Sequence, residues 1–290
     1  MKHFNNHTKL QVITKFIFVI SLFSLFACQT TQVNEIDPFA TIGEGADVYV
    51  FLPIDGNEFF LEKILGEKAQ QKDIKTALER TEKLYAGIFT QKTSPRAKDE
   101  TLICSIGDYP AHLADMIFKE TNGWTKTQAN NGVNYYSGGI NSISIPNNKN
   151  SLLVIAKEPE VSMKPFLENA NNEKFVTFSE NYDSFVKTTT KDAVGIFIKN
   201  PNFLIAKILG SDLQLPVKAS EIYLIKNTEE NFYTYNFTIE TGNRMTAFAL
   251  NTILRAYLKA DVRTSDAKVY IENGKLTSDK LSNLINKIFY

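Results

Sequence analysis

The sequence is poor in the residues that most often carry catalysis or bind transition metals. Its 290 residues include two cysteines and three histidines, and His112 is the only histidine after residue 7. A zinc site needs three or four Cys, His or carboxylate ligands, and catalysis of the Ser-His-Asp type would depend on His112 alone. The sequence also has neither a Gly-x-Ser-x-Gly motif nor a phosphate-binding glycine loop. We therefore expect no catalytic residue, no metal site and no cofactor, and hence not an enzyme.

Arginine is scarce, and basic residues are not in excess. After residue 27 the chain has 29 basic residues, only five of them Arg, against 32 acidic ones. Proteins that bind nucleic acid neutralise phosphates with clustered Lys and Arg, so we expect no nucleic-acid partner. The 43% hydrophobic and 22% charged composition is that of a globular protein.

The N-terminal segment has an apolar run that is too short to span a bilayer as a helix. Phe16–Phe26 is eleven uncharged residues, preceded by three lysines and no acidic residue. A spanning helix needs about 18–20 residues, whereas the core of a signal peptide needs about 7–15. The run ends in the residues Leu25, Phe26, Ala27 and Cys28, which resemble the lipobox of bacterial lipoproteins.

The lipobox resemblance implies that residues 1–27 are a lipoprotein signal peptide and that Cys28 carries a diacylglycerol anchor, including palmitate. The partner would then be membrane lipid, reached through acylated Cys28, and the protein would be exported and lipid-anchored to the cell envelope. An ordinary secretory signal or an uncleaved anchor are the alternatives. After lipidation Cys104 is the single free thiol, so no intramolecular disulfide can form.

The rest of the chain predicts an α+β fold with a mainly antiparallel sheet packed by amphipathic helices. Residues 28–45 are mostly polar, which predicts a flexible tether. We expect residues 46–290 to form a single composite domain. Apolar spacing predicts a long helix over 74–88, a helix after Pro110 and helices over 244–259 and 277–290. We expect strands at 46–52, 101–106, 140–145, 152–156, 192–198, 221–226, 232–240 and 269–271, with a turn at Gly274 before the last helix.

A faint repeat relates two parts of this domain. Residues 46–52 and 192–198 are each a predicted strand, followed by a turn and a short apolar helix that ends in Lys-Ile-Leu-Gly. An ancient duplication with halves of about 46–157 and 192–290 is one explanation of this order, and chance similarity is the other.

Several predicted helices have strongly apolar faces. One explanation is that these faces cover the sheet, and the other is that some contact lipid or the membrane surface. The helix over 244–259 has an unusually wide face, formed by Met245, Phe248, Ala249, Leu250, Ile253, Leu254, Tyr257 and Leu258. The candidate lipid- or membrane-contacting residues are Phe60, Leu61, Ile64, Leu65, Phe203, Leu204, Ile208, Leu209, Leu281, Leu284, Ile285, Ile288 and Phe289.

The lipobox with Phe26, the chain length and these amphipathic helices resemble the treponemal outer-membrane-associated lipoproteins. This resemblance implies a non-catalytic lipoprotein, associated with the outer membrane, whose apolar helix faces bind lipid or the bilayer surface. The alternative is a lipid-anchored binding module for another envelope protein or a host ligand. The sequence leaves the oligomeric state open.

Overall fold

The computed structural model describes residues 38–43, 45–65, 72–89, 100–128, 134–138, 141–145, 153–156, 185, 192–202, 205, 214–227 and 232–289. All of them belong to one compact unit, residues 36–290. The predicted signal peptide and Cys28 lie outside the described residues.

The described elements are mostly strands, with helices before, between and after them. The helices are α2 (Pro38–Ile42), α3 (Glu58–Leu65), α4 (Lys72–Glu79), η2 (Ala111–Leu113), α5 (Ala114–Ile117), η3 (Glu120–Asn122), α9 (Arg244–Leu258) and α10 (Ser278–Phe289). The strands of the first half are β1 (Val48–Pro53), β2 (Thr81–Phe89), β3 (Glu100–Gly107), β4 (Thr125–Gln128), β5 (Asn134–Gly138), β6 (Asn141–Ser144) and β7 (Leu153–Ala156). Those of the second half are β8 (Ala193–Ile198), β9 (Val217–Lys226), β10 (Phe232–Thr241), β11 (Arg263–Ser265) and β12 (Lys268–Thr277).

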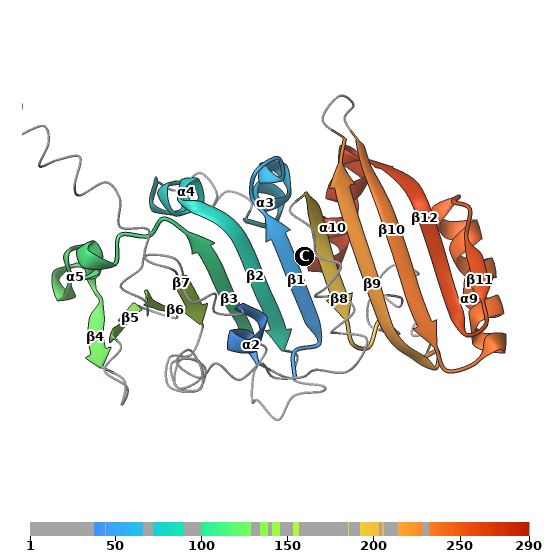
Figure 1. The fold of residues 1–290 in the computed structure, drawn as a ribbon, viewed down its shortest axis with the longest axis horizontal. Coiled ribbons are helices and arrows are strands. Elements are labelled where there is room, and N and C mark those ends of the chain that lie inside the picture. Colours follow the sequence, from blue (N-terminus) through green and yellow to red (C-terminus); the bar gives the residue numbers. More distant parts are fainter. Residues whose placement is uncertain are drawn as a thin grey trace, which may run out of the picture. The chain divides into compact units, whose positions relative to one another are not determined.

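The twelve strands form one sheet in the order β11-β12-β10-β9-β8-β1-β2-β3-β7-β6-β5-β4 (Figure 1). Every neighbouring pair is antiparallel. The prediction of an α+β fold with a mainly antiparallel sheet is therefore confirmed.

The two halves of the chain meet at the centre of this sheet, where β1 lies beside β8. Val50 is opposite Ile196 in the pair, and these two residues occupy equivalent positions in the predicted repeat. From this pair β1-β2-β3-β7 extends in one direction and β8-β9-β10-β12 in the other. Equivalent residues that face each other across an antiparallel pair are what a local two-fold relation produces. This arrangement is compatible with the duplication, which stays a prediction.

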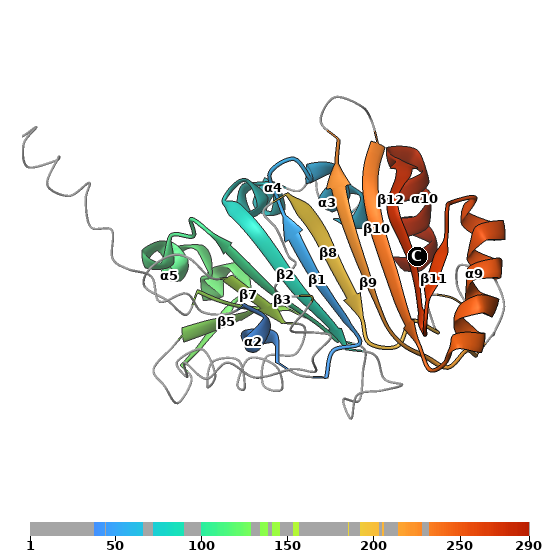
Figure 2. The same cartoon turned by 45° about the vertical axis from the view of Figure 1, so that its right-hand side comes forward.

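Side chains alternate between the two faces of the sheet, as strand geometry requires. Tyr49 and Phe51 of β1 pack on one face in a core that includes Phe39 and Ile42 of α2. Leu52 points to the other face, where it packs in a core with residues of α3 and α10. Figure 1 shows α2 in front of the sheet and α10 behind it, and Figure 2 shows α10 beside β12.

Helix α9 packs on β10 and β12, and its start is defined by a capping residue. The Oδ1 atom of Asn243 accepts a hydrogen bond from the Thr246 backbone N–H at 2.9 Å, which satisfies one of the free donors of the first turn. Leu250 and Leu254 are buried against Ile239 and Val269 of the sheet. The helix predicted over 244–259 is confirmed.

The long helix predicted over 74–88 is wrong in its second half. Helix α4 ends at Glu79, and Thr81–Phe89 is the strand β2, which pairs with β1 on one side and β3 on the other. Pairing on both sides satisfies the backbone of β2 without a helix, and Gly87 weakens a helix by about 1 kcal/mol. A Cβ atom at Gly87 would collide with Ile42 of α2, so the strand also needs a glycine here.

The turn predicted at Gly274 is a β-bulge inside β12, and this prediction is also wrong. The pairing of β10 with β12 shifts between Tyr235 and Phe237, opposite Asn273, which has a φ of 54°. The Asn273 backbone N–H donates to Oδ1 of Asn236 at 2.9 Å. An Asn-Gly pair favours the left-handed region that both turns and bulges use, so the sequence alone does not separate them.

Gly274 lies directly opposite Tyr235, and a Cβ atom at this position would overlap the Tyr235 ring. The ring is half-buried and packs against two cores, so moving it away from a Cβ atom would disturb these contacts. We expect Gly274→Ala to lower the free energy of unfolding by about 1–3 kcal/mol, as overpacking does. Urea denaturation measures this change. The loss of unfolding free energy caused by Gly274→Ala should be smaller in a protein that also carries Tyr235→Ala. An equal loss with and without Tyr235→Ala would contradict the proposed overlap.

Candidate lipid- and membrane-contacting surfaces

The predicted contact residues of α3 and α10 that the structure describes lie mostly in the core. Phe60, Leu61 and Leu281 are only 3%, 5% and 5% exposed. They pack together with Leu52 and Leu224 on one face of the sheet. Leu284 is half-buried. Phe60, Leu61 and Leu281 therefore cover the sheet and pack against each other.

The other predicted contact residues are not described at the side-chain level. Ile64 and Leu65 belong to α3, and Ile285, Ile288 and Phe289 to α10, but their side chains lie outside the described residues. Phe203, Leu204, Ile208 and Leu209 lie outside them entirely. Of the predicted helix around them, Asn202 and Ile205 are helical, and Ile205 is buried beside Ile239.

The core beneath α3 and α10 contains a polar atom without a partner. Tyr233 is fully buried there, and its hydroxyl has no hydrogen-bond partner among the described residues. Burial and the charge of Glu58 raise the pKa of this hydroxyl, so it stays neutral. A buried unsatisfied hydroxyl costs about 1–3 kcal/mol, so the closed packing of α3 and α10 carries an energetic penalty.

Exposed apolar side chains gather instead on the outer face of α9. Met245 is 83% exposed and Phe248 is 51% exposed, three residues apart on the helix. The guanidinium of Arg244 lies 5.4 Å from the centre of the Phe248 ring. We call Arg244, Met245 and Phe248 the α9 outer face. The opposite side of α9, with Ala247 and Leu250, is completely buried.

A second, smaller exposed apolar pair lies on α5, the single helical turn found where a longer helix after Pro110 was predicted. Met116 is 62% exposed and Ile117 is 49% exposed. The neighbouring Asp115 carboxylate accepts hydrogen bonds from Lys126 at 2.9 Å and from the Tyr136 hydroxyl at 2.6 Å. The hydrogen bond from Lys126, and to a smaller extent that from Tyr136, lowers the pKa of Asp115. Both bonds hold α5 against β4 and β5.

The described residues give little indication of a catalytic or metal-binding site. His112 is exposed in η2. Within the described ranges no group of three His, Cys, Asp or Glu residues is placed to hold a metal ion. No helix among those the structure describes has the length and apolar character to cross a membrane.

Sequence reasoning found the amphipathic helices but assigned their apolar faces only in part. It included Met245 and Phe248 in one wide face with Leu250 and Leu254, although the first two are exposed and the others buried. The sequence could have separated the two pairs, because the helical period places 245 and 248 on one face of the helix and 250 and 254 on another.

The fold and these surfaces define an α+β protein whose antiparallel sheet is covered by amphipathic helices, with apolar side chains left exposed on α9 and α5. A family model described as "Outer membrane-associated lipoprotein TP0453" matches residues 33–282. The chain belongs to this family and is thus an envelope lipoprotein of the outer membrane-associated kind.

Similarity to a curated protein sequence and to solved structures agrees with this assignment. The chain is 27% identical to outer membrane protein TP0453 of Treponema pallidum (strain Nichols), over 95% of each chain. Crystal form III of TP0453 has a TM-score of 0.71 at 26% identity, covering 87% of this chain and 99% of that one. Crystal form I has a TM-score of 0.70 at 26% identity, covering 89% and 99%. The predicted treponemal lipoprotein resemblance and the envelope localisation are therefore confirmed.

The burial of Leu281 leads to a stability prediction. We expect Leu281→Ala to lower the free energy of unfolding by about 2–5 kcal/mol, because it leaves a cavity between α10, α3 and the sheet. Leu284→Ala, at a half-buried position one turn later, is the matched variant and should cost clearly less. Chemical denaturation of both variants checks the order, and equal costs near zero would mean that α10 is not docked on the core in solution.

Proposed function

We propose that this protein is a non-catalytic lipoprotein, anchored by acylated Cys28, that contacts membrane lipid through apolar helix faces. The observation that carries the proposal is the exposed α9 outer face. Membership in an outer membrane-associated lipoprotein family supports a location where such a face would meet lipid.

The α9 outer face has the composition that suits a lipid interface. Met245 and Phe248 present apolar surface that the sheet does not need, since α9 already buries Ala247 and Leu250 on its other side. Arg244 places a cation next to Phe248. Interfacial helices combine an apolar face buried in the acyl boundary with cations that meet anionic headgroups.

The buried faces of α3 and α10 form a second candidate contact surface, available only if these helices move. Phe60, Leu61 and Leu281 would then leave the sheet together, since they pack in one core. The Tyr233 hydroxyl, which has no hydrogen-bond partner among the described residues, lowers the stability of the closed packing. A membrane offers these residues an apolar environment equivalent to the core, so an open state near lipid costs less than in water.

The alternative is a lipid-anchored module that binds another envelope protein or a host ligand. The exposed apolar pair of α5, Met116 and Ile117, would suit such a partner as well as a membrane. Binding to protein-free vesicles separates the two functions, because a protein-binding module has no need to associate with lipid.

The anchor is tested by removing the acylation site. We expect Cys28→Ser to abolish incorporation of radiolabelled palmitate and to leave the protein as a soluble or unprocessed form, because the thioether can form only on the thiol. Cys104→Ser is the matched control and should keep the label, since this cysteine is buried in the core. Label that persists in the Cys28→Ser protein would contradict the assignment.

The membrane contact is tested by vesicle flotation of the non-acylated Cys28→Ser protein. We expect it to float with vesicles that contain anionic phospholipid, and the further changes Met245→Glu and Phe248→Glu to reduce the floating fraction at least fivefold. Both positions are exposed, so these substitutions should change the free energy of unfolding of the protein by less than about 0.5 kcal/mol. The matched control carries Thr125→Glu and Thr127→Glu, which add the same charge on exposed positions of β4.

Three outcomes of the flotation experiment are informative. Loss of flotation in the α9 variant alone supports contact through the α9 outer face. Flotation that both variants retain would move the contact away from α9. Absence of flotation in the parent protein would favour the protein-binding alternative.

A further inference from the structure

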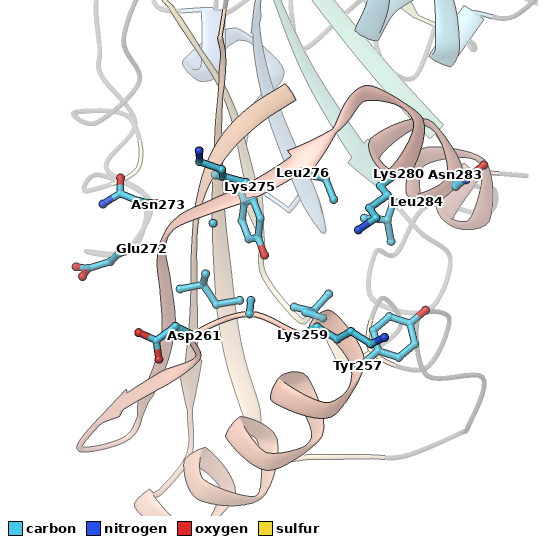
Figure 3. A pocket seen from close by; sticks show the side chains of 15 residues that line it. Tyr257, Lys259, Asp261, Glu272, Asn273, Lys275, Leu276, Lys280, Asn283 and Leu284 are labelled. Atoms are coloured by element: carbon cyan, nitrogen blue, oxygen red, sulfur yellow. The ribbon is translucent and has the colours of Figure 1, made fainter. Parts of the chain in front are cut away.

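A cleft opens where the end of α9 approaches the start of α10 above strand β12 (Figure 3). Its volume is about 630 Å³, and its lining comes from β10, β12, the end of α9 with the following residues, and the first half of α10. Proteins hold single small ligands in clefts of about 300–1,000 Å³, so this one has the right size for one such molecule. It is separate from the α9 outer face, because none of Arg244, Met245 and Phe248 lines it.

The lining of the cleft is about equally polar and apolar. Tyr235, Leu258, Ile271, Leu276 and Leu284 contribute apolar side chains to it. Ile271 is 2% exposed, and the other four are half-buried. These side chains come from β10, α9, β12 and α10, and the four half-buried ones form a surface that a hydrocarbon chain would cover.

The charged groups around the cleft are divided between its two sides. Lys259 and Lys280 lie on one side, near Tyr257 and Leu284, and Asp261 and Glu272 lie on the other (Figure 3). Both carboxylates have a cationic partner, since Arg263 lies 2.8 Å from Asp261 and 3.6 Å from Glu272, and Arg255 lies 4.0 Å from Asp261.

The two lysines have no such compensation. Neither the Lys259 nor the Lys280 ammonium forms an ion pair or a side-chain hydrogen bond within the part of the chain that the structure describes. The third lysine of the lining, Lys275, directs its ammonium 4.7 Å from the centre of the Phe232 ring. The α10 side of the cleft is therefore positive, next to these apolar side chains.

We propose that the α9–α10 cleft binds a single-chain anionic amphiphile of the fatty-acid class. The acyl chain lies along the half-buried side chains of Tyr235, Leu276 and Leu284, and the carboxylate meets the ammonium groups of Lys259 and Lys280. An inorganic anion would leave the apolar part of the lining exposed to water, and a neutral lipid would leave the lysines without a partner. The cleft volume fits one ligand of this size.

The experiment is isothermal titration of the Cys28→Ser protein with monomeric dodecanoate and, in parallel, with dodecanol. No vesicle is present, so the result does not depend on whether the α9 outer face docks on membranes. We expect dodecanoate to bind about tenfold more tightly than dodecanol, which is the size that two exposed ion pairs supply together. Lys259→Glu with Lys280→Glu should remove this preference for the anion and weaken dodecanoate binding at least tenfold.

A matched variant controls for net charge. Lys75→Glu with Lys119→Glu makes the same charge change on exposed residues that do not line the cleft, and it should leave both affinities within twofold of the parent protein. Equal affinity for the acid and the alcohol, or dodecanoate binding that Lys259→Glu with Lys280→Glu leaves unchanged, would overturn the assignment. So would the absence of dodecanoate binding to the parent protein. None of these results would bear on vesicle flotation through α9.

Discussion

The antiparallel pairing of β1 with β8 is the interaction on which the rest of the structure depends. It joins segments that are far apart in the sequence, with Val48 opposite Ile198 and Phe51 opposite Gly195. Through this pair a seven-stranded run that begins at β1 and a five-stranded run that begins at β8 become one sheet with apolar side chains on both faces. A sheet of this kind is stable only if helices cover it, and α2, α3, α9 and α10 supply that cover.

The need to cover the sheet decides which apolar residues are available to lipid. Phe60, Leu61 and Leu281 have the pattern of a membrane-contacting surface, yet the sheet and the neighbouring helix bury them. The residues left over, such as Met245 and Phe248 on α9, are few and contribute nothing to the core. The division between a structural and an outward apolar surface therefore follows from the width of the sheet and from the position of each helix on it.

Sequence patterns predicted the elements well wherever local and tertiary preferences agree. The strands β1, β3, β8 and β10 and the helix α9 are at the expected residues. The prediction failed at 81–89, where apolar spacing is compatible with a helix but the positions beside β1 and β3 demand a strand. It failed again at Gly274, where an Asn-Gly pair forms a bulge within β12 because the strand continues along β10. Both failures arise from pairing with distant segments, which a local pattern does not contain.

The sequence by itself determined the class of fold, the amphipathic helices and the resemblance to outer-membrane-associated lipoproteins, because periodicity and the N-terminal motif are local properties. Only the tertiary structure decided which side of each helix is buried, since this depends on where the sheet lies. It also brought Lys259 and Lys280 to one side of a cleft above Ile271, although 21 residues separate them in the chain. Such a site depends on four elements that meet in space, and no spacing along the chain encodes their distance.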